Sequence, residues 1–309
     1  RRVKMLKGYD AKILADSIAP NGARLTTFLI SIPKFIQAEL NTHRMLSRNS
    51  ASTRAVPAAK MRQRVIDDPV LPVFWGKNQA GMQAAEELSD ADQINVEHNG
   101  SVFGMQVGTT TSRGAAREAW LEGAKEAVAL AQHLSEGRGL HKQIANRVLE
   151  PFLFVEVVVS ATEWANFWRL RCHKDAQPEF RVVAEKMHAL YLENVPMGLA
   201  LGQWHLPWID LEDVNTVGIA LEGPEAVKRV SVARSARLSY LTHEGKRDVR
   251  DDLALCERLA ASGHWSPFEH VARPIDLPLK GYAEDGSPRC GNFIGWHQYR
   301  ADLDPHFQW

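Results

Sequence analysis

The distribution of apolar and polar positions along the 309-residue chain predicts both strands and helices. Two apolar runs rich in β-branched residues, at 23–31 and 152–161, are typical of buried strands. Apolar residues recur at helical spacing over 115–136, and Gly137 and Gly139 predict the end of that helix. The chain is therefore expected to combine long helices with a buried sheet.

Helical spacing also occurs in the second half of the chain. The stretch 163–194 is predicted to be helical, with a kink or turn near Lys174 and Pro178. Shorter helices are predicted over 225–241 and 248–263.

Other segments carry signals for turns and irregular structure. Ser31 is a plausible N-cap with Pro33 in the following first helical turn, which predicts that a helix begins directly after the first strand. The segment 56–110 is rich in Pro, Gly, Asn and Gln and is predicted to be irregular. The domain prediction is a core portion at 1–195, a connector at 196–223 and a second portion at 224–309.

Charge and cysteine content narrow the function classes. The chain has 37 basic and 37 acidic residues, which excludes a non-specific binder of nucleic acid, because that role needs a basic excess. The three cysteines lie far apart without CxxC spacing, which argues against disulfides and a zinc site. No apolar run approaches membrane-spanning length. We expect a soluble, cytoplasmic protein with no membrane partner.

A basic, hydroxyl-rich stretch, "NTHRMLSRNSASTR" at 41–54, is the first candidate for chemistry. It contains one His, three Arg and three Ser, and no Lys, Glu or Asp occurs from 40 to 59. Guanidinium, hydroxyl and backbone N–H groups together favour a phosphate site. The alternative is the C-terminus of a helix, where His and Arg are favourable, followed by a solvated loop.

Two further stretches are candidates. In 166–181, arginines alternate with aromatic residues, which fits either an amphipathic helix or a cation aimed at a site. In 263–270, "GHWSPFEH", two His and one Glu surround a Ser-Pro turn. His264 and His270 are six residues apart across a Pro and lack the spacing of a metalloprotease pair, so no metal site is predicted.

Taken together, these stretches resemble the flavin-dependent thymidylate synthase family. Positions 43–54 follow its basic motif without a gap, and 166–179 resembles its Asn-Phe-x-x-x-Arg helix with the Ala-Gln-x-Glu that follows. The stretches 236–240 and 263–270 resemble its Ala-Arg-x-Ser-Tyr strand and Gly-His-x-Ser-Pro-Phe-Glu-His turn. The matching positions of the first two motifs are His43, Arg44, Ser47, Asn49, Ser52, Arg54, Asn166, Arg171, Ala176, Gln177 and Glu179.

The order of the motifs differs from that of ordinary family members, in which the Gly-His block precedes the basic motif. The chain therefore resembles a permuted member, or one built from a duplicated unit. A weak echo between 26–44 and 272–300, each a strand followed by a Phe-led segment with a basic end, fits duplication. Positions that depart from the family pattern are Glu39, Thr42, Ser50, Asn146 and Asp175.

The resemblance implies an α+β fold, with a mostly antiparallel central sheet flanked by helices, in a homotetramer with shared active sites. It implies reductive C5-methylation of a uridine monophosphate, dUMP by default and UMP as an alternative. FAD would be the cofactor, with methylenetetrahydrofolate and NADPH as co-substrates. The departures leave open a hydroxymethyl or other C5-modified product, and a non-catalytic nucleotide-binding protein is the remaining alternative.

The resemblance also implies roles for single residues. Arg171 would be catalytic, as a cation that stabilises charge developing on the uracil carbonyl edge. If the displaced block has moved in sequence but not in space, it shares one flavin pocket with the basic motif. The expected substrate-binding residues are Glu39, Ser50, Ser52, Arg54, Arg147 and Arg171. The expected cofactor-binding residues are Thr42, His43, Arg44, Met45, Asn166, Asp175, His264, Ser266 and Glu269.

Overall fold

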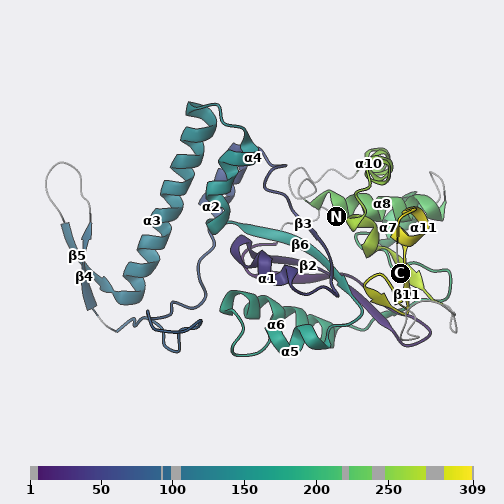
Figure 1. The fold of residues 1–309 in the computed structure, drawn as a ribbon, viewed down its shortest axis with the longest axis horizontal. Coiled ribbons are helices and arrows are strands. Elements are labelled where there is room, and N and C mark those ends of the chain that lie inside the picture. Colours follow the sequence, from purple (N-terminus) through teal and green to yellow (C-terminus); the bar gives the residue numbers. More distant parts are fainter. Residues whose placement is uncertain are drawn as a thin grey trace.

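A five-stranded sheet in the order β3-β6-β2-β1-β7 forms the centre of the computed structural model (Figure 1). The structure describes residues 6–91, 93–98, 106–217, 223–238, 248–275 and 289–307. The strands are β1 (Asp10–Ile18), β2 (Arg24–Pro33), β3 (Ser47–Ser50), β4 (Gln93–His98), β5 (Gln106–Thr111), β6 (Phe154–Ala161), β7 (Met197–Gly198), β8 (Ala272–Pro274), β9 (Arg289–Cys290), β10 (Phe293–Ile294) and β11 (Trp296–Gln298).

The helices of the described residues surround this sheet. The α-helices are α1 (Gln37–Asn41), α2 (Ala58–Asp67), α3 (Ser112–Gln132), α4 (Lys142–Ala145), α5 (Ala165–Arg171), α6 (Pro178–Glu193), α7 (Leu211–Val217), α8 (Pro224–Ala236), α10 (Val249–Ala261) and α11 (Tyr299–Leu303). The 3₁₀ and π turns are η1 (Lys34–Ile36), η2 (His133–Gly137), η3 (Asn146–Phe152) and η5 (Ser266–His270).

Both faces of the central sheet are buried, which explains the apolar runs of β2 and β6. Neighbouring strands pair antiparallel, except for the short parallel pair of β1 and β7. Phe28 and Ile30 of β2 belong to the core under α5 and α6, whereas Leu29 packs with Trp208 on the other face. Strands buried on both faces are apolar at successive positions. The predicted α+β fold with a mostly antiparallel sheet is confirmed.

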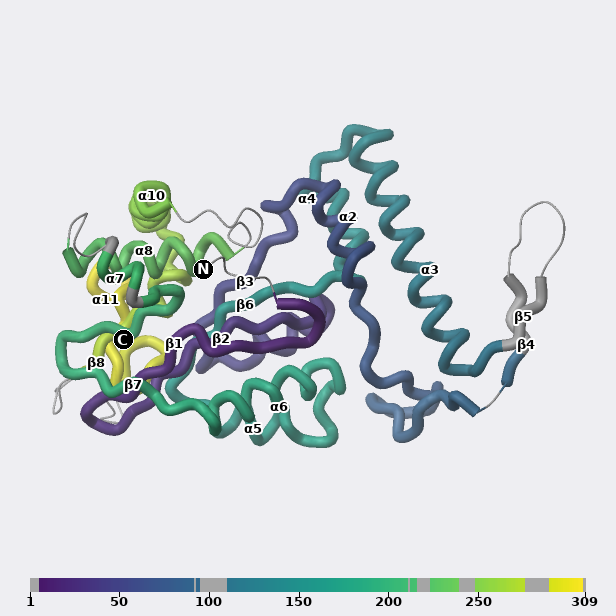
Figure 2. The backbone as a smooth tube through the Cα atoms, turned by 180° about the vertical axis from the view of Figure 1, so that it is seen from behind, coloured from purple at the N-terminus to yellow at the C-terminus, as the bar shows by residue number. Residues whose placement is uncertain are grey.

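The helices divide between the two ends and one face of the sheet. Helices α5 and α6 form a layer along one face, and the break predicted near Lys174 separates them, with Pro178 in the first turn of α6. Helix α3 and the β4–β5 hairpin project beyond one end of the sheet (Figures 1 and 2). Helices α8, α10 and α11 lie at the opposite end (Figures 1 and 2).

Several local predictions are wrong. Ser31 does not cap a helix, because β2 continues to Pro33 and Ser31 pairs with Glu156 in the ladder; the helical turn begins at Lys34. The segment 56–110 is not simply irregular, since it contains α2, β4 and part of β5. Helix α2 forms there because its apolar side chains pack against α3 in a separate small core. The predicted connector also contains β7 and α7.

Strand β1 was not predicted. A register shift between Ile13 and Ala15 interrupts its pairing with β2, so its apolar positions do not alternate regularly. The helices predicted over 225–241 and 248–263 are present as α8 and α10. Residues 239–247 and part of the predicted internal echo lie outside the described residues. The domain boundaries stay a prediction.

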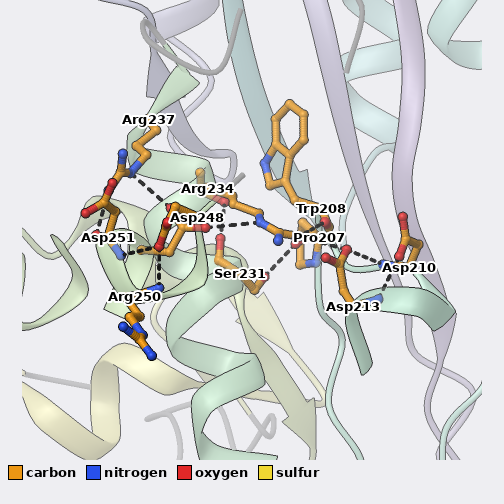
Figure 3. A network of polar contacts seen from close by, with 12 residues as sticks. Pro207, Trp208, Asp210, Asp213, Ser231, Arg234, Arg237, Asp248, Arg250 and Asp251 are labelled. Atoms are coloured by element: carbon orange, nitrogen blue, oxygen red, sulfur yellow. Dashed lines mark hydrogen bonds and ion pairs between the residues drawn. The ribbon is translucent and has the colours of Figure 1, made fainter. Parts of the chain in front are cut away.

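An ion-pair network joins α8 to α10, to α7 and to the segment before α7 (Figure 3). Arg234 of α8 is 1% exposed and lies 2.7 Å from Asp213 and 3.3 Å from Asp252. Its Nη1 donates to the carbonyl oxygen of Trp208 at 3.0 Å, and Arg237 lies 3.0 Å from Asp252. A buried charge needs such pairing, because an uncompensated one would be strongly destabilising.

A chain of buried hydrogen bonds, called the relay below, joins the C-terminal third to the sheet. Ser17 Oγ and Thr27 Oγ1 lie 2.9 and 2.8 Å from the two ring nitrogens of His205. Ser160 Oγ lies 2.6 Å from Thr27 Oγ1 and 2.8 Å from His270 Nδ1. Burial lowers the pKa of each imidazole to about 3. Both rings are therefore neutral near pH 7 and link β1, β2 and β6 to η5.

Candidate active site

Arg171, at the C-terminal end of α5, is held in one orientation by its neighbours. Its Nε donates to His43 Nε2 at 2.8 Å, and its Nη1 lies 2.8 Å from Glu39 Oε2. Its Nη2 lies 3.4 Å from Thr42 Oγ1, and its guanidinium carbon lies 4.7 Å from the ring centre of Phe180. Residues 39–43 and α5, far apart in sequence, therefore form one cluster around a cation.

His43 is a buried acceptor within this cluster. Its ring packs edge-to-face with Phe167 at a centroid distance of 5.0 Å. Burial, followed by the nearby Arg171 and Arg48, lowers the pKa of His43 to about 4. The ring is therefore neutral at pH 7, and the hydrogen bond that Nε2 accepts assigns its proton to Nδ1. The structure thus places His43 as a support for Arg171, and the cofactor contact implied for it stays a prediction.

A cavity of about 620 Å³, called the central cavity below, borders this cluster. Glu39 and Arg171 line it from one side, and Asp175 of the α5–α6 turn lines it from another. Met82 and Gln83, from a segment with no predicted role, also line it. The structure therefore brings together three of the predicted site residues around one space.

Ser52 and Arg54 lie in the turn between β3 and α2, outside the lining of the central cavity. Asn146 holds this turn from inside, since it is fully buried and donates to the carbonyl oxygens of Thr53 at 2.9 Å and Val56 at 3.1 Å. Arg54 is exposed and forms no ion pair with a carboxylate of the described residues. The turn therefore offers a free cation on a rigid backbone.

Arg147 lies beside the same turn. Its side chain is 51% exposed, and Nη1 lies 2.8 Å from Glu150 Oε1. The Glu150 carboxylate also accepts from Thr53 Oγ1 at 3.0 Å. The departure at Asn146 therefore has a structural explanation, as a clamp for the turn, and the neighbouring Arg147 carries the positive charge at the surface.

The remaining predicted residues of the first two motifs make separate contacts. Ser50 Oγ accepts from Gln37 Nε2 at 2.7 Å. Met45 Sδ lies 3.8 Å from Arg289 Nη1 of the C-terminal third. Asn166 is exposed at the start of α5 and accepts from an arginine of the same helix at 2.8 Å. None of these residues lines the central cavity.

The displaced Gly-His block packs on β3. Ser266 Oγ lies 3.4 Å from Asn49 Oδ1, so the block touches the basic motif directly. Glu269 Oε1 lies 2.7 Å from Arg300 Nη1, and His264 is exposed with its Nδ1 2.7 Å from a neighbouring serine hydroxyl. The block therefore returns to the basic motif, although none of its three predicted residues lines the central cavity.

Sequence reasoning missed the segment 72–88, which lines the central cavity through Met82 and Gln83. The available signal was the pair Gly76 and Gly81 around a polar tip, which is typical of a turn between short extended arms. The predicted irregularity of the segment concealed this signal.

Two other kinds of feature are absent from the described residues. No group of three or more His, Cys, Asp or Glu side chains there could hold a metal ion. No helix of that part of the chain is long and apolar enough to cross a membrane. All three cysteines are free, and burial raises the pKa of Cys256 and Cys290 to about 11, so neither is a thiolate nucleophile near pH 7.

The chain was compared with known families, proteins and structures. The model of the family described as thymidylate synthase complementing protein matches residues 24–197. A UMP/dUMP methylase PolB from Streptomyces cacaoi, solved with 5-Br dUMP, is 17% identical with a TM-score of 0.42, over 62% of this chain and 93% of that chain. The 5-Br UMP complex is 16% identical with a TM-score of 0.40, over 62% and 92%. No curated protein sequence matches significantly.

Proposed function

Because the chain belongs to the thymidylate synthase complementing protein family, whose model covers residues 24–197, we propose that it methylates C5 of a uridine monophosphate. The reaction is flavin-dependent and reductive, with methylenetetrahydrofolate as one-carbon donor and NADPH as reductant. The substrate is dUMP by default, and UMP is the alternative. The working unit is a homotetramer with shared active sites.

The observation that carries this proposal is the fixed guanidinium of Arg171 at the wall of the central cavity. Attack by C5 on an electrophilic one-carbon unit requires electron density to move through the ring, and a cation at a ring carbonyl stabilises the charge that develops. A donor held in place before the reaction is worth more than a mobile one, because no reorganisation is needed. His43 and Glu39 provide this preorganisation.

Glu39 adds a hydrogen-bond acceptor to the cluster, beside the donors of Arg171. Its carboxylate lies 2.8 Å from Arg171 and is 39% exposed, so one side of the pair accepts and the other donates. The edge of a uracil ring presents a carbonyl acceptor next to an N3–H donor, which is the complementary order. The same pair matches the edge of cytosine through its exocyclic amino group, so a cytidine nucleotide belongs among the test substrates.

The phosphate of the nucleotide is assigned to the turn with Ser52 and Arg54. Arg54 is an exposed cation without a carboxylate partner among the described residues, and Asn146 fixes the backbone around it. A guanidinium and backbone N–H groups recognise phosphate oxygens. Arg147, on the neighbouring surface, is assigned to the same subsite. In the proposed homotetramer, this turn of one subunit lies at the central cavity of another subunit.

The chemistry of the basic motif fits FAD. Arg44 is exposed and forms no ion pair with a described carboxylate, so it is available for a diphosphate. Thr42 and Asp175 present a hydroxyl and a carboxylate to the cofactor. When bound, the flavin would supply the reducing equivalents of the reaction. The other residues assigned to the cofactor are His43, Met45, Asn166, His264, Ser266 and Glu269.

Product analysis tests the proposal. The full chain is incubated with FAD, methylenetetrahydrofolate, NADPH and one of dUMP, UMP or CMP, and the product is identified by mass spectrometry. A methylated uridine nucleotide is the expected result, with turnover reduced on the order of a hundredfold or more in Arg171→Ala. A hydroxymethylated product would indicate the alternative C5 chemistry. Nucleotide binding without any product would indicate a non-catalytic binding protein.

A further inference from the structure

Residues 72–88 form a two-armed flap beside the proposed site. Gly76 pairs with Glu87 in an antiparallel bridge, and Lys77 N–H donates to the carbonyl oxygen of Glu86 at 2.8 Å. The arms lie so close together that a Cβ on Gly76 would collide with the methyl group of Ala84. The flap is therefore a defined piece of structure and not a loose loop.

The flap is held at its base and at its tip by the α5–α6 region. At the base, Val73 N–H donates to Glu179 Oε1 at 3.0 Å, and Trp75 packs edge-to-face with Trp120 of α3. At the tip, the Gln83 side-chain amide donates to the carbonyl oxygen of Asp175. The flap thus spans the α5–α6 turn and encloses space beneath it.

That space is a second cavity of about 790 Å³, called the flap cavity below. Its apolar wall comes from three different elements, with Phe35 of η1, Phe74 of the flap and Trp120 of α3. Neither Phe35 nor Phe74 stacks on another aromatic ring of the described residues, and Phe35 is 41% exposed. Free aromatic faces around a cavity favour a flat ring as ligand.

One charged group at the flap cavity, the ammonium group of Lys174, favours an anionic ligand. Two acids line this cavity: Glu179 accepts from Val73 N–H and from a glutamine side chain, and the side chain of Asp175 is 65% exposed. Lys174, in contrast, forms no ion pair with a carboxylate of the described residues, and it lines the same space. An unpaired ammonium group at the rim is suited to a carboxylate or a phosphate.

The flap cavity and the central cavity are separated by a thin wall. Met82, Gln83 and Asp175 line both, and the hydrogen bond from Gln83 to Asp175 crosses the boundary. Ala176 and Gln177 also line both cavities, so the aromatic-lined space adjoins the space beside Arg171. A ligand in the flap cavity would therefore lie next to the space beside Arg171.

We propose that the flap cavity is a second ligand site, which takes a flat nitrogen heterocycle carrying an anionic group. Only the identity of the two ligands named next rests on the proposed function. The one-carbon donor has such a ring joined to carboxylates, and the nicotinamide dinucleotide has one joined to phosphates. The ring lies against Phe35, Phe74 and Trp120, the anionic group pairs with Lys174, and Gln83 separates the ligand from the nucleotide.

Equilibrium binding to the full chain, saturated with FAD, tests the site. The probes are folinic acid and NADP⁺, and the variants are Phe35→Ala and Lys174→Ala, with Lys77→Ala as a matched control on the exposed face of the flap. We expect about fivefold to tenfold weaker binding of one probe in Phe35→Ala. Lys174→Ala weakens the same probe, and more so at low salt. Lys77→Ala binds as the unaltered chain does.

The responding probe identifies the source, folinic acid for the carboxylate ligand and NADP⁺ for the phosphate ligand. The proposal is overturned if neither probe binds, if binding is unchanged in both Phe35→Ala and Lys174→Ala, or if the probe binds only by displacing FAD. Titration with dUMP in parallel separates this outcome from the proposed function. Loss of dUMP binding with Phe35-dependent probe binding would remove the proposed function and leave the second site in place.

Discussion

Replacing His43 by Phe tests whether a neutral imidazole positions the proposed catalytic cation. The change keeps an aromatic ring beside Phe167 but removes the acceptor that lies 2.8 Å from Arg171 Nε. A hydrogen bond to a charged group contributes about 1.5–3 kcal/mol, so its loss in the transition state would lower kcat roughly 10- to 150-fold. The KM for the nucleotide should change little, because the phosphate is assigned to Arg54 and not to His43.

His43→Gln is the matched control, since its side-chain oxygen can return an acceptor near the position of Nε2. We expect His43→Gln to recover most of the turnover that His43→Phe loses. The pH profile separates positioning from proton transfer. Because the pKa of His43 is lowered to about 4, the acceptor is present above pH 4 and is lost only as the pH falls through 4. His43 should therefore add no inflection to kcat between about pH 6 and 8.

Steady-state kinetics with dUMP decides the matter. A His43→Phe enzyme within twofold of the unaltered kcat would refute the positioning role, provided that its thermal unfolding is unchanged. An inflection near neutral pH that disappears in His43→Gln would instead show that the ring titrates during turnover. Either result would contradict the reasoning from burial and geometry.

Three further predictions follow from other contacts. Arg54→Ala should weaken nucleotide binding by about 1.5–3 kcal/mol in a titration, and more than Ser52→Ala, because a guanidinium makes charge-assisted hydrogen bonds; equal affinity would place the phosphate elsewhere. The pKa of His205 and of His270 is lowered to about 3, so both rings resist protonation in the folded chain. The free energy of unfolding should therefore be highest above about pH 6.5 and should fall as the pH drops towards 3. Chemical denaturation at pH 5 should show a loss of about 2 kcal/mol for each ring. His270→Asn, which keeps a polar group near Nδ1, should remove about half of this slope, and an unaltered slope would contradict it.

Much of the fold could be predicted because its strongest elements are locally encoded. Strands β2 and β6 are buried on both faces, so their apolar runs are visible without knowledge of their partners. Strand β1 could not be predicted in the same way, because the irregularity between Ile13 and Ala15 breaks its period. The end of β2 was misplaced because Ser31 is a good N-cap residue, and only its pairing with β6 shows that it belongs to the strand.

The candidate site, like the fold, could be predicted only in part. The chemistry of Arg171 could be inferred from a motif, but its partners could not, since His43 and Glu39 lie 128 and 132 positions away. Asn146 departs from the family pattern, and only its burial and its hydrogen bonds show that it holds the turn with Arg54 in place. The flap was not predicted, because Gly-rich, polar segments are typical of loops. Only its contacts with Asp175 and Glu179 show that it has a defined position.

The relay has a consequence for how the chain acquires its structure. Its hydrogen bonds join positions 188, 178, 133 and 110 residues apart, so none of them forms until distant parts of the chain have met. Contacts of such long range slow folding, because the entropy of closing the intervening chain is lost before they form. During synthesis the strands leave the ribosome before His270, so β2 and β6 can pair while the face that carries Thr27 and Ser160 is not yet covered by η5. The sheet therefore passes through a stage in which that face is open to chaperones and to other chains.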